Sequence, residues 1–301
     1  MTTSPARTAR PRASTVGTRR WNGAALWALG LGVAALSLLG PLLAGAIDYR
    51  ISDEVIMSQL LGLDAVSLAI VAPLAAAAGT LALRDSPVWP LLAMGPALYV
   101  AYMVPQYVLG PDYVNRDGNN EAFFPLFLAL LVLALTIALS AWREMDLDRI
   151  ETSGRAERLV ARWLLPVAAF LVFSRYVPLL ADTMSGAPTS AEYLAGPTFL
   201  WTITLLDLGF ALPATVAAIV GFRRGAGWAR RALYSVVGWF SLVGLAVAAM
   251  AIAMYARDDP GSSLGSVVFM AVLGLGLTAL ALALAVPVAA AHRRDDARLT
   301  A

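Results

Sequence analysis

Long stretches of nearly uninterrupted apolar residues recur along the chain, and each is about long enough to cross a bilayer. A hydrocarbon core of about 30 Å needs roughly 20 apolar residues as helix, and a helix satisfies its own backbone hydrogen bonds in lipid. Two stretches, near residues 163–181 and 193–222, hold one charged residue each, Arg175 and Asp207. Six stretches hold none: residues 21–47, 65–83, 86–111, 122–142, 232–256 and 260–291. We therefore predict an all-α, polytopic transmembrane helical bundle of about eight spans.

Composition agrees with this fold class and excludes several kinds of chemistry. Charged residues make up 14% of the chain, against about 25% in a typical soluble domain. The sequence has no lysine, which excludes a Schiff base and a Walker A lysine, and no cysteine, which excludes disulfides and thiolate ligands. The lone histidine, His292, stands where the last span ends, and we interpret it as interfacial. We expect no cofactor, no bound metal and no enzymatic activity.

Arginine supplies every basic side chain apart from His292, and its positions predict the orientation. If the amino terminus is cytoplasmic, eighteen arginines fall in inside segments and three, Arg50, Arg116 and Arg257, in outside segments. Cytoplasmic loops carry such an excess of positive charge. We therefore predict a bacterial cytoplasmic membrane protein with both chain ends in the cytoplasm. An aromatic belt at the inner boundary fits this orientation: Trp21, Trp89, Trp142, Trp163 and Trp228.

The polar segments divide the chain into two units of four spans. We predict a disordered cytoplasmic tail, a first unit, a cytoplasmic linker of alternating charge, a second unit and a cytoplasmic tail, over residues 1–20, 21–142, 143–162, 163–291 and 292–301. The first apolar run ends at Ala44-Gly45-Ala46, which also resembles the end of a cleaved signal peptide. Because the run is longer than a typical signal core, a retained first span is the preferred interpretation.

The two units resemble each other in the order of a few residues. Pro-Leu-Leu-Ala ends a span at Pro41 and again at Pro178. The later landmarks follow in the same order: Asp64, Pro73, Arg84 and Trp89, then Asp207, Pro213, Arg223 and Trp228. Four spans per unit is an even number, so both copies would enter the membrane from the same side. We predict parallel repeats related by an axis along the membrane normal.

The same landmarks carry a resemblance to known sequences. The run from Leu63-Asp64 through Pro73 to Arg84, with the residues at 97–102 and 124–128, resembles uncharacterised bacterial multi-span integral membrane proteins. The second copy is similar to this pattern at residues 206–209, Pro213, Gly221, Arg223 and Arg224. The resemblance implies an integral membrane protein of about eight spans without an assigned activity, and it transfers no catalytic residue.

Asp207 and Arg175 are the strongest candidate functional residues, because an ionisable side chain inside a span costs about 2.5–3.5 kcal/mol. Asp207 lies roughly 12 Å and Arg175 roughly 9 Å below the outer face, at 1.5 Å per residue. Consecutive antiparallel helices are usually neighbours, so the two charges can meet. One hypothesis is an internal ion pair that fixes the packing of the fifth and sixth helices. The other is a proton- or substrate-binding site in which Asp207 changes protonation.

Asp64 is a weaker candidate for substrate binding. It stands at the predicted outer start of the second span, where a carboxylate can cap a helix and interact with its dipole, and capping is the preferred interpretation. Pro73 and Pro213 lie inside spans and predict kinks. The outer loop at residues 112–121 is acidic, but it lacks the spacing of an EF-hand, and solvated acids are preferred over a weak cation site.

Two functions fit these observations. The preferred one is a non-enzymatic membrane component, such as a scaffold, a sensor or a complex subunit, with association through small-residue faces at residues 75–79 and near Gly274 and Gly276. The alternative is a secondary transporter or permease for a small solute, proton-coupled through Asp207, with Arg175 beside the substrate. We expect membrane lipid as a partner, no nucleic acid, and a second copy or another membrane protein as a further partner.

Overall fold

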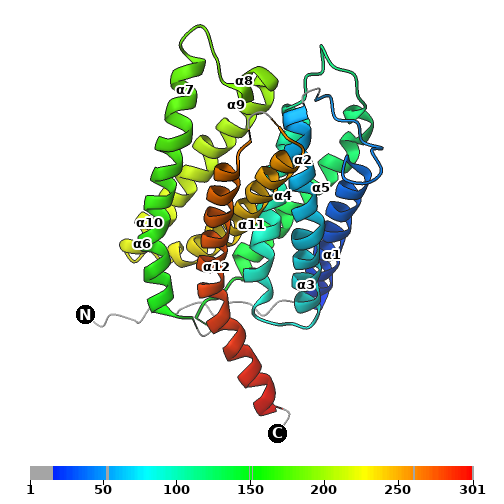
Figure 1. Cartoon of the computed structure of the whole chain (residues 1–301). Coiled ribbons are helices and arrows are strands. Elements are labelled where there is room, and N and C mark those ends of the chain that lie inside the picture. The colour runs from blue at the N-terminus through cyan, green and yellow to red at the C-terminus, as the bar shows by residue number, and fades with distance from the viewer. Residues whose placement is uncertain (1–15, 52–53, 149, 151, 260–261, 300–301) are drawn as a thin grey trace, which may run out of the picture.

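The computed structural model describes residues 16–51, 54–148, 150, 152–259 and 262–299. These residues form helices and no strands, arranged as a bundle of roughly antiparallel spans (Figure 1). Eight helical runs in the described part of the chain are long and apolar enough to cross a membrane, which confirms the predicted fold class. Their bounds are Gly17–Leu39, Ile56–Leu83, Trp89–Leu109, Asn120–Glu144, Gly154–Thr183, Pro197–Arg223, Ala229–Ala256 and Leu264–Val288.

Several spans consist of more than one helical element. The second, fifth and sixth each contain a short π-helical turn between two α-helices, the fourth begins with the 3-10 turn η2, and α8 lies between the fifth and sixth. The elements are α1 (Val16–Leu39), α2 (Glu54–Val66), η1 (Ser67–Val71), α3 (Ala72–Leu83), α4 (Trp89–Leu109), η2 (Asn120–Phe123), α5 (Phe124–Glu144), α6 (Gly154–Leu171), η3 (Val172–Tyr176), α7 (Val177–Thr183), α8 (Ala191–Ala195), α9 (Pro197–Leu206), η4 (Asp207–Ala211), α10 (Leu212–Arg223), α11 (Ala229–Ala256) and α12 (Leu264–Leu299).

Each π turn is followed at once by a proline at the second position of the next helix: Pro73, Pro178 or Pro213. A proline cannot donate a backbone hydrogen bond, and its ring crowds the carbonyl four residues earlier. Widening the preceding turn relieves that crowding, and the next amide then bonds to the carbonyl five residues back, as Leu212 does to Asp207. The kinks predicted at Pro73 and Pro213 therefore take the form of π turns.

One helix, α11, provides most of the contact between the two halves of the bundle. α11 packs against α2 and α4 of the first half, and α9 also contacts α4. Glycines permit this close approach: Gly95 faces the backbone of Gly238, and Gly62 faces that of Ala249 and Met250. Lipid tails are as apolar as leucine, so helices in a membrane associate through such close packing of small residues.

The small-residue faces predicted to bind a partner are used within the chain. Ala75 is fully buried, and a Cβ on Gly79 would meet the backbone of Gly23 in α1. Gly274 faces Gly244 in α11, whereas Gly276 has open space around it. Of the proposed association surface, Ala77 and Gly276 remain exposed in the described chain.

Neighbouring helices correspond between the two halves. Within each half, the first span packs on the second, the second on the third, the third on the fourth, and the first on the fourth. Corresponding structural features also lie 140 positions apart in the two halves. They are the first residues of two π turns (Ser67 and Asp207), the prolines after them (Pro73 and Pro213), the residues that cap the following helices (Arg84 and Arg224) and the first residues of α5 and α12 (Phe124 and Leu264). The duplication stays a prediction, but this register aligns Asp207 with Ser67 rather than with Asp64.

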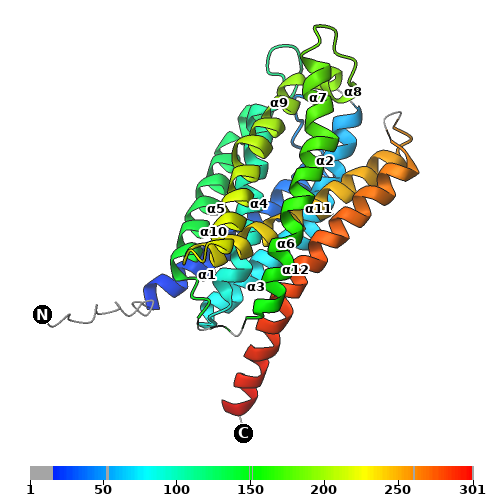
Figure 2. The same cartoon turned by 90° about the vertical axis from the view of Figure 1, so that its left-hand side faces the viewer.

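Helices extend beyond several predicted boundaries. α1 begins at Val16, inside the tail predicted as disordered, while residues 1–15 lie outside the described part. α6 begins at Gly154, inside the predicted linker. α12 continues to Leu299, so most of the predicted carboxyl-terminal tail is helical and extends past the bundle (Figures 1 and 2). A polar side chain alone does not end a helix, because a turn or a capping residue is needed. The predicted boundaries rested on polar side chains and so do not coincide with the helix ends.

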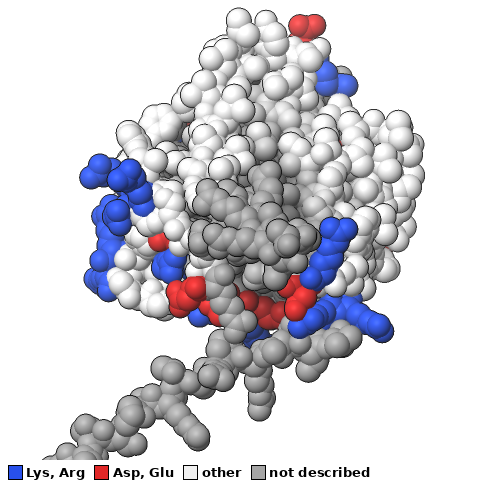
Figure 3. All heavy atoms as spheres, turned by 90° about the horizontal axis from the view of Figure 1, so that it is seen from below, with Lys and Arg blue, Asp and Glu red and all other residues white. Residues whose placement is uncertain are grey.

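α1 begins and α12 ends at the same end of the bundle (Figures 1 and 2). Basic side chains gather at this end (Figure 3), which we call the arginine-rich end.

The contact at Gly62 should be essential for packing α2 against α11. A Cβ at this position would lie 2.5 Å from the carbonyl carbon of Ala249, and backbone cannot move aside easily. We expect Gly62→Ala to lower the free energy of unfolding by about 1–3 kcal/mol, the usual cost of overpacking, in a thermal melt of the detergent-solubilised protein. Gly276→Ala is the matched control, because its surroundings are open, and it should melt no lower than the wild type. Equal melting of both variants would contradict the close α2–α11 contact.

Candidate functional site

Asp207 is the first residue of the π turn η4, ten positions into the sixth span. At 1.5 Å per residue it lies roughly 15 Å from the start of that span, near the middle of the membrane. Its side chain is half-buried, and tyrosine hydroxyls donate to both carboxylate oxygens. Tyr102 donates to Oδ1 at 2.7 Å and Tyr176 donates to Oδ2. Two neutral donors therefore hold this intramembrane carboxyl group.

The tyrosines come from different parts of the fold. Tyr102 belongs to α4 in the first half, and Tyr176 is the last residue of η3 in the second half. The ring of Tyr102 lies edge-on to that of Trp239 in α11, with centroids 5.2 Å apart. Asp207 consequently lies where the third, fifth and sixth spans meet, at the junction between the two predicted units.

Arg175 does not pair with Asp207. Its Nη2 donates to Oε1 of Glu192 at 2.7 Å, and its guanidinium lies over the ring of Tyr176, 5.7 Å from the centroid. Glu192 belongs to α8, in the connection between the fifth and sixth spans. The predicted ion pair between Arg175 and Asp207 is therefore wrong. The sequence placed both charges at similar depth in the membrane. The structure instead pairs Arg175 with Glu192, a carboxylate of the connecting segment.

Both candidate charges lie on π turns. Asp207 opens η4, and Arg175 and Tyr176 close η3. A π turn contains about one more residue per turn than an α-helix, so it changes the direction in which the following side chains point. Such turns often occur at functional sites. Here Pro178 and Pro213 directly follow the two turns. Proline thus shapes the backbone at the two positions that bear charge.

Asp64 lies in a separate, closed cluster. It is 1% exposed and stands near the end of α2, ten residues after that helix begins, so the predicted role as an amino-terminal cap is wrong. Tyr107 donates to its Oδ1 at 3.4 Å, while no hydrogen-bond partner for Oδ2 is found among the described residues. The neighbouring hydroxyls of Ser67 and Tyr99 bond to each other at 3.0 Å.

A small cavity adjoins this cluster, with Ser37, Ser67, Tyr99 and Tyr107 in its lining. About 10 Å³ is free for the centre of a water molecule, which is close to the least space that one water needs. The structure therefore does not bring Asp64 together with Asp207 and Arg175. It gives Asp64 an enclosed polar environment inside the first half.

Two loop segments, residues 46–51 and 110–121, cover the first half at the end opposite the arginine-rich end. The segments pair through backbone and side-chain bonds, among them Asp48 N to Asn119 Oδ1 at 2.9 Å and Arg50 to Glu121 at 3.0 Å. Tyr49 points inward from this cover, 1% exposed, and stacks on Tyr107 with centroids 5.0 Å apart. We call these two segments the outer cover.

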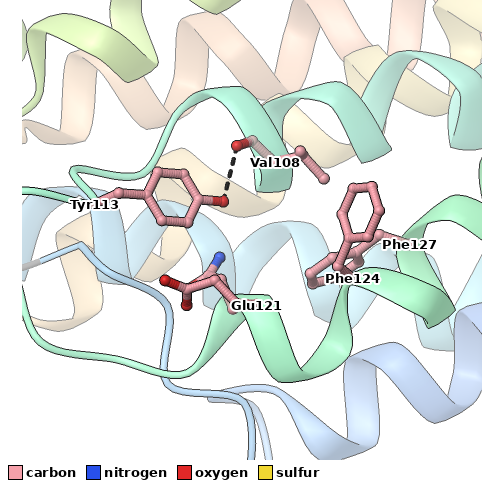
Figure 4. A pocket seen from close by; sticks show the side chains of 6 residues that line it. Val108, Tyr113, Glu121, Phe124 and Phe127 are labelled. Carbon is pink, nitrogen blue, oxygen red and sulfur yellow. Dashed lines mark hydrogen bonds between the residues drawn. The ribbon is translucent and has the colours of Figure 1, made fainter.

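The outer cover also borders an open pocket of about 380 Å³ (Figure 4). Figure 4 shows Tyr113 donating from its hydroxyl to the carbonyl of Val108, at 2.8 Å, with the rings of Phe124 and Phe127 on the other side. Partial burial raises the pKa of Tyr113 above its ordinary value. Glu121, the pocket's carboxylate, is already paired with Arg50.

The acidic loop weighed as a weak cation site uses its oxygens internally. Both carboxylate oxygens of Asp112 accept hydrogen bonds from the side chain of Asn115, which keeps the pKa of Asp112 below its ordinary value. No group of three or more side chains suited to hold a metal ion is found among the described residues.

The tyrosines and Glu192 were not predicted as site residues. A tyrosine in an apolar span gives little signal alone, because aromatic residues are common in cores and at interfaces. One signal was available: Tyr99, Tyr102, Gln106 and Tyr107 recur at helical spacing within the third span. That polar stripe marks α4 as the helix that contacts both Asp64 and Asp207. Glu192 carried no signal, because loop position alone does not predict its partner.

Comparison with models of known protein families, with curated proteins and with solved structures finds no match for this chain.

The tyrosine hydroxyls should stabilise the fold through Asp207. We expect Tyr102→Phe and Tyr176→Phe each to lower the free energy of unfolding by about 1–3 kcal/mol, because each removes a hydrogen bond to a carboxyl group and leaves an oxygen unpaired. Thermal melts of the solubilised variants measure this loss. Tyr255→Phe, at an exposed position in α11, is the control and should melt like the wild type. If both test variants also melt like the wild type, the tyrosines do not support Asp207.

Proposed function

We propose that the protein is a secondary transporter or permease for a small solute, proton-coupled through Asp207. The observation that carries this proposal is the set of groups that bond to Asp207 in the described part of the chain: they are two tyrosine hydroxyls, while the nearby Arg175 bonds to Glu192 instead. An unpaired carboxylate is costly to keep inside a membrane, and such groups commonly mark proton or substrate pathways. A carboxyl group without a basic partner can lower that cost by taking up a proton or a cation.

The position of Asp207 supports the proposal. Transporter sites lie near the bilayer midplane between repeated units, often where helices are interrupted. Asp207 is near the middle of its span, on a π turn, and its tyrosine partners belong to opposite halves of the chain. It is half-buried, whereas Asp64 is almost fully enclosed.

The hydrogen-bond chemistry links protonation to helix position. A charged Asp207 accepts from both tyrosines, whereas a protonated carboxyl group has one oxygen that must itself donate. Proton uptake therefore requires one of the hydroxyls to turn or move away. Because Tyr102 belongs to the first half and Asp207 to the second, a change at the Tyr102 bond alters a contact between the halves.

The non-enzymatic membrane component is the second candidate. The closed first half favours it, because the outer cover and the aromatic stack of Tyr49, Tyr107 and Phe127 seal the cluster around Asp64. Close glycine contacts between α2 and α11 also suit a rigid scaffold or complex subunit. Under this function, the tyrosine bonds of Asp207 would serve only to fix the packing of three spans.

The apolar spans are suited to contact membrane lipid, so lipid is the expected environment of the protein. We further propose that it resides in the bacterial cytoplasmic membrane with the arginine-rich end in the cytoplasm. The arginine distribution supports this orientation through the positive-inside preference.

Proton exchange at Asp207 is the test of the proposed function. We expect infrared difference spectra of the reconstituted protein, recorded between about pH 5 and pH 9 to bracket carboxyl titration inside proteins, to contain a carboxylic acid band that Asp207→Asn removes. Asp64→Asn, which alters the enclosed carboxyl group, should leave the band in place. A spectrum without such a band, or one in which Asp207→Asn leaves it unchanged, would exclude proton coupling at Asp207 and favour the membrane component.

The absence of cysteine allows a direct test of orientation. Val114 is 90% exposed in the outer cover, and Gly227 has open space in the turn before α11. We expect a membrane-impermeant maleimide to label Val114→Cys in intact cells and to label Gly227→Cys only after the cells are opened. The reverse pattern would overturn the proposed orientation.

A further inference from the structure

Five exposed arginines gather where the fifth span begins and the sixth ends. We call them the arginine cluster; they are Arg155, Arg158, Arg162, Arg223 and Arg224. α6 and α10 pack against each other as consecutive spans of opposite direction, so the start of α6 lies beside the end of α10. Basic side chains are prominent on this side of the arginine-rich end (Figure 3, left).

The three arginines of α6 share one face of that helix. Arg155, Arg158 and Arg162 recur at spacings of three and four residues, which places them in a row. Trp163, beside the row on the same helix, is 54% exposed. The opposite face, which includes Val160 and Leu164, is buried against the bundle. The row therefore points away from the protein interior.

No acidic side chain pairs with the arginine cluster in the described part of the chain. Other arginines at the same end do have partners: Arg19 pairs with Asp85 at 2.7 Å, and Arg230 pairs with Glu157 at 3.0 Å and with Asp148 at 3.3 Å. Arg230 thus occupies Glu157 and Asp148, two carboxylates contributed by α6 and the segment before it. The cluster keeps five guanidinium groups available for an external anion.

The spans beside the cluster are on the periphery of the bundle. In the most apolar segment of the fifth span, 22% is buried within the protein, and the value for the sixth span is the same. The corresponding share is 44–61% for the first three spans. Trp163 and Trp228 flank the cluster with exposed rings, and tryptophan concentrates at the level of lipid headgroups. The anion that reaches these arginines most directly is therefore one held in the bilayer itself.

We propose that the arginine cluster binds the headgroup of an anionic phospholipid, with the acyl chains lying along α6 and α10. The arginine fork matches phosphate oxygens in a bidentate arrangement, which favours a phosphate-bearing lipid over a single carboxylate. Five arginines exceed the charge of one phosphate, so a lipid with two phosphates, such as cardiolipin, fits the cluster best. Basic pockets between spans are known to bind this class of headgroup.

Competition between lipids tests the proposal. The purified protein is placed in mixed micelles with equal amounts of phosphatidylcholine and cardiolipin, and bound lipid is counted by native mass spectrometry. We expect the wild type to retain cardiolipin preferentially. The triple variant Arg155→Gln, Arg158→Gln and Arg162→Gln should lose at least about tenfold of that preference, because each arginine near a charged headgroup contributes measurably to binding. The double variant Arg223→Gln and Arg224→Gln should lose it in part.

A matched triple variant separates a site from general charge. Arg20→Gln, Arg84→Gln and Arg143→Gln remove the same charge from the first half at the same end, where these side chains are also exposed. This control should keep the cardiolipin preference of the wild type. Equal loss in both triple variants would mean that lipid responds only to total charge, and an unchanged preference in the Arg155, Arg158 and Arg162 variant would mean that the cluster is not the site. Either result overturns the proposal.

Discussion

Backbone hydrogen bonding is the constraint on which this structure depends. Lipid offers no donor or acceptor, so each amide and carbonyl in the spans must find a partner within the protein. Continuous helix meets this demand, and glycine allows the helices to approach closely where side-chain burial alone provides little driving force. Proline is the exception, because it cannot donate. At Pro73, Pro178 and Pro213 the chain responds with a wider turn, and two of those turns bear the charges of the candidate site.

α4 connects the polar groups that the spans bury. Tyr99 bonds to Ser67, Tyr102 to Asp207 and Tyr107 to Asp64, so one helix contacts polar residues in both halves of the chain. The two carboxyl groups nevertheless have different surroundings. Asp64 is enclosed beneath the outer cover, whereas Asp207 is half-buried and belongs to a more peripheral span.

Charge is distributed unevenly over the arginine-rich end. At this end Arg19 of the first half pairs with Asp85, and Arg230 at the start of α11 pairs with Glu157. At the start of α6 and the end of α10 the arginines have no such partners among the described residues. Within the part of the chain that the structure describes, these five guanidinium groups form no internal ion pairs that could stabilise the fold. An exposed guanidinium of this kind stays hydrated or binds an anion. What distinguishes the arginine cluster from a general excess of positive charge is that its five arginines gather where two adjoining helices, α6 and α10, begin and end.

The apolar pattern by itself determined the class of the fold and the number of spans, because span length depends only on hydropathy and helical rise. It also located Asp207 and Arg175, since a charge in an apolar run is visible without a structure. The sequence did not determine the hydrogen-bond and ion-pair partners of these charged residues. Arg175 binds Glu192 from a connecting segment, Asp207 binds tyrosines from two other spans, and Asp64 lies ten residues inside its helix rather than at its start. Such contacts depend on which helices become neighbours and how each is rotated, and these features arise from packing between residues distant in sequence. Only the tertiary structure could decide them.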